Sequence, residues 1–396
     1  MSLSHDSSSS PCSPFDAEQD DPTVASLLSV LGGIQDSRKA RGKIYQLVFV
    51  LAVSLVAVLG GAANFRQIAD QAADFPQDLL EKLGGKWCHF RRRYRVPSEK
   101  TMRNMFAGID ADHLDKTIGR WLREHVYHDG DKTLHVAIDG KVLRGVRTGD
   151  DHQFTLFSAM IHDNGVTIAQ IRVPPDTNEI TQVKALLDPV TAREGERVVV
   201  TMDAAHTQRD TATYLAGTRG FDYIMNTKGN QPTLLLAVSK KAVSLITDTP
   251  GHIVRERAHG RINQWETWIT NADEIDFPHA QQIGCIRRQV FDLDQVRISR
   301  EYAWILTSAP PSNMTATDLH EHVRAHWGIE NKSHYVRDTT WREDAHHINI
   351  GNAPQVMATL RNTAASLLRI HGHRHIKKTT EWISRNPCRA LAMLIT

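Results

Sequence analysis

The stretch LHVAIDGKVLRGV, residues 134–146, carries the first evidence for the fold. Its opening residues are apolar apart from His135 and predict a buried β-strand that ends on Asp139. A glycine and the cations Lys141 and Arg144 follow this carboxylate closely. An isolated acid at the end of a buried strand is costly. A carboxylate that holds a metal ion beside a polyanion would explain both the acid and the positive charge around it.

The segment after this strand alternates between strand and helix patterns. Residues 154–173 contain two apolar runs joined by Asp163-Asn164-Gly165, which predicts a β-hairpin. A helix pattern at 179–190 precedes the continuous apolar strand RVVVTMD, and a further helix near 208–219 leads to the short strand YIMNTK. This order predicts an α/β fold with a sheet of mixed strand direction.

Two of the apolar strands end on an aspartate, Asp139 and Asp203. Open α/β sheets bind their ligands outside the carboxyl ends of the strands. Two neighbouring carboxylates repel each other unless one is protonated or a cation lies between them. Either aspartate alone is more often a helix cap or a turn residue, but the pair favours a metal site.

A two-metal site needs a third acid, and RAHWGIENKSHY, residues 324–335, offers Glu330. Apolar and aromatic residues surround it at helical spacing, so we expect Glu330 to face inward. Glu321 competes with it but lies in a polar stretch. Glu343 and Asp344 also compete, but they follow a strand-like TTW and fit a helix cap.

The composition limits the classes of protein that need to be considered. The four cysteines form no CxxC pair, which argues for a reducing compartment and against structural zinc or a disulfide framework. The longest apolar run, Leu47 to Leu59, is too short for the roughly 20 residues that span a bilayer, and it predicts a buried helix. Residues 1–37 contain six acids and no Lys or Arg, so the remainder is basic and suits a polyanionic partner.

Several motifs, in this order along the chain, resemble one family closely. They are AIDGKVLRG, NEITQVKALL, TMDAAHTQ, TKGNQPTLL, the HGR of 259–261 and HWGIENKSHYVRDTTWREDA. They resemble the DDE-class transposases of bacterial insertion sequences, specifically the subfamily that includes the H-repeat-associated proteins. The resemblance runs from about residue 25 to near the C-terminus. It implies a ribonuclease H-like core in which Asp139, Asp203 and Glu330 bind Mg²⁺, with Mn²⁺ as a substitute and Asp203 as the bridging ligand.

Pattern and resemblance together predict the organisation of the chain. We expect a disordered Ser-rich and acidic head at 1–24 and a helical region at 25–126 that binds DNA ends. The catalytic domain would occupy 127–396, with a β-rich subdomain inserted at about 251–310. This insertion fits the long gap between Asp203 and Glu330.

Side chains near the acids are candidate DNA contacts. Exposed strand-end cations or ordinary loop residues are the alternatives for most of them. Related transposase groups place a Tyr, an Arg and a Lys at fixed offsets from their glutamate, where this chain has Val323, His326 and Arg337. The tryptophans Trp265 and Trp268 either pack in a core, which we favour, or stack on a flipped base. The candidate DNA contacts are Lys141, Arg144, Lys228, Asn230, Arg261, His326 and Asn331.

The resemblance implies a metal-dependent transposase of the bacterial cytoplasm that cleaves and joins DNA at insertion-sequence ends. Its partners would be double-stranded DNA, as terminal inverted repeats and target, and a second copy of the chain in the synaptic complex, with no membrane. Two alternatives are a non-transposing Mg²⁺-dependent endonuclease on the same core and a catalytically inactive DNA-binding derivative. The intact acidic triad argues against the inactive derivative.

Overall fold

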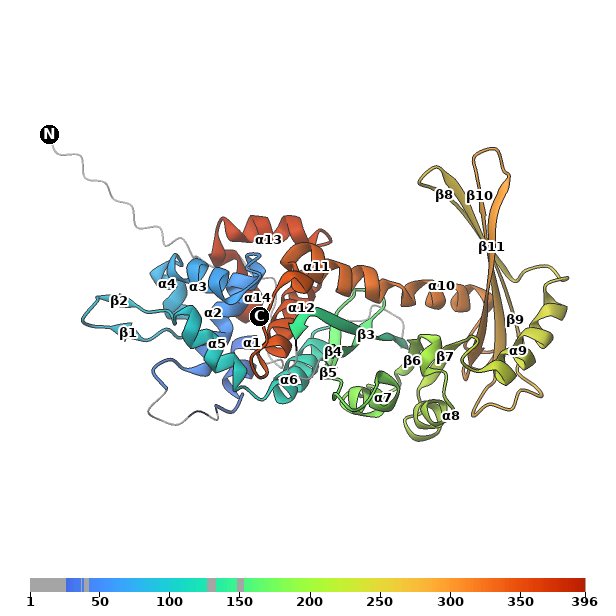
Figure 1. Ribbon diagram of the computed structural model, residues 1–396, viewed down its shortest axis with the longest axis horizontal. Coiled ribbons are helices and arrows are strands. Elements are labelled where there is room, and N and C mark those ends of the chain that lie inside the picture. Colours follow the sequence, from blue (N-terminus) through green and yellow to red (C-terminus); the bar gives the residue numbers. More distant parts are fainter. Residues whose placement is uncertain (1–25, 37, 39–42, 127–132, 148–152, 396) are drawn as a thin grey trace.

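The computed structural model describes residues 26–36, 38, 43–126, 133–147 and 153–395. Figure 1 shows an elongated molecule in which N-terminal and C-terminal helices pack together at one end. A sheet leads from these helices to a set of long strands at the other end. The predicted disordered head at 1–24 lies outside the described residues.

The helical end is built around α2, Leu47–Leu59, in which every residue except Val48 is buried. It contacts α12, Ala353–Ile370, and the Trp341 indole N–H donates to the Val58 carbonyl at 2.9 Å. The prediction of a buried helix is therefore confirmed. Among the described residues, no helix combines the length and the apolar character that a membrane crossing needs. The surrounding helices are α1 (Leu27–Gly32), α3 (Phe65–Ala73), α4 (Gln77–Lys82), α5 (Glu99–Ala107) and α6 (Ala111–Glu124).

One nine-stranded sheet runs through the molecule in the order β5-β4-β3-β6-β7-β11-β10-β9-β8. The strands β3, β6 and β7 are parallel, and the remaining pairs are antiparallel. The part from β5 to β7 is the mixed, ribonuclease H-like sheet that was expected. Its strands are β3 (Thr133–Arg147), β4 (Gln153–Ile161), β5 (Thr167–Arg172), β6 (Arg197–Met202) and β7 (Asp222–Thr227).

The β-rich stretch forms four strands that extend this same sheet. They are β8 (His252–Ala258), β9 (Arg261–Asn271), β10 (Gln282–Phe291) and β11 (Arg297–Thr307). Because β11 pairs with β7, the stretch continues the core sheet directly. Trp265 and Trp268 are 8% and 4% exposed, and the Trp268 indole donates to the Asp248 carbonyl, so both tryptophans pack in the interior as favoured.

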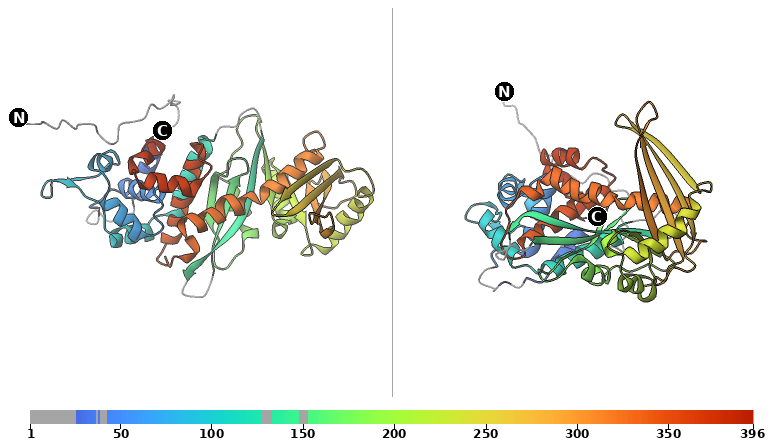
Figure 2. Two further views of the ribbon diagram at one scale, coloured as in Figure 1. Left: turned by 90° about the horizontal axis from the view of Figure 1, so that it is seen from above. Right: turned by 45° about the vertical axis from the view of Figure 1, so that its right-hand side comes forward.

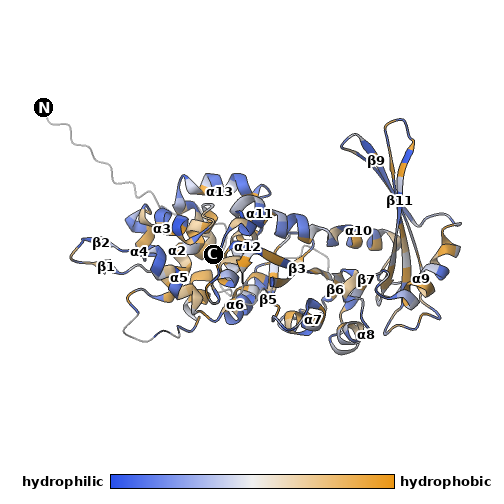
Figure 3. Ribbon diagram, viewed as in Figure 1, coloured by the Kyte–Doolittle hydropathy of each residue, from blue (hydrophilic) through white to orange (hydrophobic). Residues whose placement is uncertain are grey.

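Helices cover the sheet and carry part of the site. Figure 2 shows the helical run from α10 (Ala316–His326) to α11 (Tyr335–Trp341) crossing the sheet. The remaining α-helices of the described residues are α7 (Glu179–Leu187), α8 (Arg209–Ala212), α9 (Pro232–Leu245), α13 (Ile376–Ser384) and α14 (Ala392–Ile395). Figure 3 shows apolar residues gathered in the helical end, whereas α13 carries many hydrophilic ones.

Two sequence predictions are wrong in detail. The strand β3 runs past Asp139 to Arg147, because β4 continues to pair with it, for example Gly140 with Phe157. The TTW run ends helix α11 and is not a strand, since Arg337 and Trp341, four residues apart, are both buried. Cys88 and Cys285 are free thiols.

Candidate active site

The register of the sheet places the two aspartates side by side. The strands β3 and β6 pair in parallel from Thr133 with Arg197 to Ile138 with Met202. Asp139 and Asp203 directly follow the last paired residues of the two strands, at the level where this pairing ends. The spacing between the two acids in the sequence is therefore the same as the register of the strands that carry them.

Glu330 begins a π-helical turn, Glu330–His334, inserted between α10 and α11. Such turns inside helices occur frequently at functional sites. The preceding Ile329 is buried against Ala137 of β3 and Met160 of β4. This apolar contact fixes the turn over the sheet and brings the glutamate to the edge where the aspartates lie.

The three acids line one hollow of about 320 Å³, together with His326, Trp327 and Asn331. We expected Glu330 to face the interior, but it is exposed and lines the open hollow. Its competitors are elsewhere: Glu321 is exposed outside the hollow, and Glu343 is buried among arginines.

Burial is the main cause that raises the pKa of Asp139, and the negative charges of Glu179, Asp203 and Glu330 add to it. The Gly140 N–H, which donates to the Asp139 carboxylate at 2.9 Å, acts in the opposite direction, and the resulting pKa is about 7. Each added anion makes the ionised form of Asp139 harder to accommodate, and a bound cation would relieve this repulsion.

The chemistry of these donors fits a hard divalent cation, because carboxylate oxygens are the ligands that such ions prefer. As the side chains stand, no three acidic, His or Cys groups of the described residues lie close enough together to hold one ion. Asp203 and Glu330 are both exposed, so their side chains have room to turn toward Asp139.

Sequence reasoning missed Glu179, the first residue of α7, as a fourth acid beside Asp139. A side chain at Gly140 would collide with its carboxylate, so the glycine after Asp139 makes room for Glu179. His206 is buried, with its Nε2 3.7 Å from Glu179 Oε2 and its ring stacked on Phe157. The only signal in the sequence was the motif NEITQVKALL, which contains Glu179 and is one of those that carry the family resemblance.

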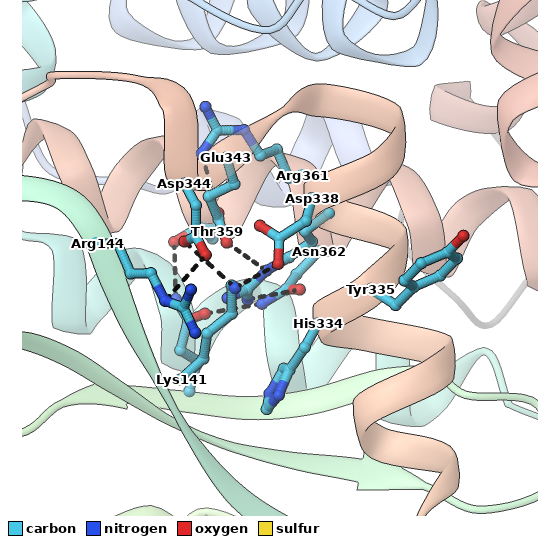
Figure 4. A network of polar contacts seen from close by, with 12 residues as sticks. Lys141, Arg144, His334, Tyr335, Asp338, Glu343, Asp344, Thr359, Arg361 and Asn362 are labelled. Atoms are coloured by element: carbon cyan, nitrogen blue, oxygen red, sulfur yellow. Dashed lines mark hydrogen bonds and ion pairs between the residues drawn. The ribbon is translucent and has the colours of Figure 1, made fainter.

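Lys141 was predicted to contact DNA, but its side chain is buried. It is 7% exposed, and its ammonium lies 2.7 Å from Asp338 Oδ2 and 3.4 Å from Asp344 Oδ1 (Figure 4). On a strand, residues two apart share a face, so Lys141 follows Asp139 inward beneath α11. Arg144 is 83% exposed and has only a loose ion pair, 3.8 Å, with Asp344.

The remaining candidate contacts divide between the hollow and other surfaces. His326 and Asn331 line the hollow, and burial lowers the pKa of His326 to about 4. Lys228 is exposed, and the Asn230 amide donates to the Ala204 carbonyl at 2.8 Å, next to Asp203. Arg261 is exposed at the turn between β8 and β9, outside the hollow.

Arg337, which stands at one of the offsets used by related groups, is an interior residue. Its Nε lies 2.8 Å from Glu343 Oε2, and its Nη1 donates to Asn362 at 3.1 Å. With 1% exposure it is not available to DNA. The roles of side chains at these offsets in other groups therefore do not transfer to this position.

The strand order defines a mixed α/β core of the ribonuclease H type, and three acids lie at one edge of it. Residues 130–367 match the family described as Transposase DDE domain, and residues 28–122 match the family described as DDE_Tnp_1-associated. The chain belongs to the DDE transposase family, and its function is that of a transposase. As a transposase it acts on DNA, and members of this family generally use divalent metal ions.

The similar proteins agree with the H-repeat-associated subfamily. YncI of Escherichia coli O157:H7 is 28% identical over 386 residues, which cover 92% of this chain and 93% of YncI. The H repeat-associated YhhI of Escherichia coli K12 is 26% identical over 358 residues, 86% of this chain and 90% of YhhI. Each bears the name of a transposase. A solved synaptic complex of the piggyBac transposase with hairpin DNA aligns at a TM-score of 0.40 and 10% identity, over 92% of this chain and 76% of that one.

Proposed function

We propose that the chain catalyses Mg²⁺-dependent cleavage and strand joining at insertion-sequence ends, with Asp139, Asp203 and Glu330 as the metal ligands. One observation supports this most: three acids from distant parts of the chain line a single hollow, and their mutual repulsion contributes to the raised pKa of Asp139. A pair of Mg²⁺ ions would activate the attacking oxygen and stabilise the leaving 3′-oxygen.

The surrounding residues hold the acids in place for this chemistry. The Gly140 N–H orients Asp139, and the Asn230 amide ties the loop after β7 to the backbone beside Asp203. Ile329 anchors the turn that carries Glu330. His326 shares a hydrogen bond with Thr201 Oγ1 at 3.0 Å and remains uncharged at neutral pH, because burial lowers its pKa. It therefore leaves the negative charge of the acids to be balanced by metal ions.

The partners follow from the same proposal. Terminal inverted repeats and target DNA are the substrates. The helical region at 25–126 recognises the ends, and the catalytic domain is a separate region at 127–396. Mn²⁺ would substitute for Mg²⁺, since both are hard ions bound by carboxylates. A homodimer would hold the two ends together during strand joining.

The test is cleavage of a labelled duplex that carries the terminal sequences flanking the gene. Wild type should cut and join with Mg²⁺ or Mn²⁺ and be inactive with EDTA, whereas Asp203→Asn should fall to background. Glu321→Gln, an exposed acid on α10 outside the hollow, is the matched control and should keep full activity. Cleavage without joining would favour the endonuclease, and equal activity of Asp203→Asn and wild type would overturn the proposal.

A further inference from the structure

A second, larger hollow of about 1130 Å³ adjoins the catalytic one. Asn331, the residue after Glu330, lines both, so the two hollows meet at the turn that carries the third acid. The second hollow lies between this turn, the β4–β5 hairpin turn and the segment that leads from α12 into α13. We call it the basic groove.

The basic groove carries an excess of positive charge. Five Lys and Arg side chains line it, against two carboxylates, Asp163 and Glu381. Among the described residues, none of the five has a carboxylate within 4.0 Å. A groove with cations that the protein itself does not neutralise attracts a polyanion. The five are Lys332, Arg369, Arg374, Lys377 and Lys378.

Two of these cations form a fixed wall. Lys332 donates to the backbone carbonyls of His162 and Asp163, and Arg369 donates to those of Gly165 and Lys332. Burial lowers the pKa of Arg369 to about 10, which leaves it charged at neutral pH. These contacts join α12, the hairpin turn and the π-helical turn, so the wall is rigid and adjoins Glu330.

The opposite wall offers cations that are free to bind. Arg374, Lys377 and Lys378 are exposed, and the latter two lie in the first turn of α13. The N-cap of this nine-residue helix, His375, forms no side-chain cap bond, so the first N–H groups and the positive end of the helix dipole add to the field. Phosphate is the anion that such helix ends accommodate well.

We infer that the basic groove binds the phosphate backbone of the duplex DNA that enters the catalytic hollow. This inference rests on the proposed function and specifies where the substrate lies. A backbone that follows the groove would be led past Asn331 to Glu330. The contacts are to phosphate, so they set the position of the DNA and carry no sequence preference.

The salt dependence of DNA affinity tests the inference, with anisotropy of a fluorescent duplex of 30 base pairs as the probe. Each phosphate contact contributes roughly 0.9 to the slope of log affinity against log salt. Lys377→Ala/Lys378→Ala should reduce the slope by about two and weaken binding at least about tenfold near physiological salt. The matched control, Lys240→Ala/Arg297→Ala, removes two exposed cations from α9 and β11 and should leave the slope unchanged.

A change of opposite sign sharpens the result. Glu381→Lys replaces an exposed carboxylate of the groove with a cation and should increase both affinity and slope. All three variants should unfold at the temperature of wild type, because the substituted side chains are exposed. An unchanged slope in Lys377→Ala/Lys378→Ala would overturn the inference while wild type still cleaves DNA. Failure of wild type to bind or cut DNA would instead overturn the proposed function.

Discussion

Two neighbouring clusters of carboxylates in this protein differ in whether Lys and Arg side chains balance their negative charge. In the hollow proposed as the active site, Asp139, Asp203 and Glu330 lie together with no Lys or Arg among the residues that line it. Beneath α11, Glu343 lies between two arginines, 2.8 Å from Arg337 and 2.9 Å from Arg361. Asp139 belongs to the first cluster, whereas Lys141, two residues further along β3, pairs with acids of the second.

The effect on proton affinity differs accordingly. Burial alone raises the pKa of Glu343, but Arg337, Arg361 and Lys141 outweigh it and hold the pKa below its usual range. Burial raises the pKa of Asp139 to about 7, and the negative charges of its acidic neighbours act in the same direction. A cluster that the protein neutralises itself maintains the fold, whereas one left unbalanced is suited to bind a cation from outside.

His334 separates the two clusters. Its Nδ1 lies 3.8 Å from Asp139 Oδ2, and Figure 4 shows it beside Lys141 at the edge of the buried network. Burial lowers its pKa to about 3, so it is neutral at physiological pH. The His334 ring therefore adds no positive charge beside Asp139.

The largest effect on stability is expected in the balanced cluster. Glu343→Gln would leave the guanidinium groups of Arg337 and Arg361 buried without their carboxylate, which costs about 3–5 kcal/mol of the free energy of unfolding. Urea denaturation at pH 7 measures this loss. The exposed substitution Glu321→Gln should change stability by no more than about 0.5 kcal/mol. Equal stability of the two variants would show that the network does not stabilise the fold.

In the hollow proposed as the active site, neutralising an acid is expected to increase the free energy of unfolding. The pKa of Asp139 is raised on folding, so the folded state binds more protons than the unfolded state between about pH 4 and pH 7. Stability is therefore lost as the pH rises through this window. Asp139→Asn should remove that loss and stabilise the metal-free protein by about 1–3 kcal/mol at pH 8, with little effect at pH 4.

Metal binding gives a second measurement for the same variant. Mg²⁺ should raise the melting temperature of wild type at pH 8, since a ligand that binds only the folded state stabilises it. Asp139→Asn should gain little from Mg²⁺ and should not cleave DNA. A variant that is less stable than wild type in EDTA at pH 8 would contradict the view that Asp139 is held against repulsion.

The sequence predicted the two apolar strand segments that bring Asp139 and Asp203 together, because each segment that leads to an acid can be recognised by itself. Their separation of 64 residues already contained the strand register, as the pairing of Thr133 with Arg197 shows. The third acid was found mainly by resemblance, since nothing in the local pattern predicts the π-helical turn that presents Glu330 at the open hollow.

The environment of the cations could not be predicted in the same way. Lys141 looked like a phosphate contact because its partners, Asp338 and Asp344, lie about 200 residues further along the chain. Burial of a charge depends on such distant partners. Glu179 was overlooked for the same reason, because the absence of a side chain at Gly140 matters only once α7 packs beside β3.

The smallest effect is expected at Glu179 and measures how far the repulsion in the hollow depends on this fourth acid. Glu179→Gln removes one of the charges that raise the pKa of Asp139, so that pKa should fall below about 7. The pH window of lost stability should then end at a lower pH, which denaturation at several pH values detects. Glu194→Gln, an exposed acid outside the hollow, should leave the window unchanged. If Glu179→Gln also left it unchanged, the repulsion on Asp139 would come from Asp203 and Glu330 alone, and the unbalanced cluster would be the triad by itself.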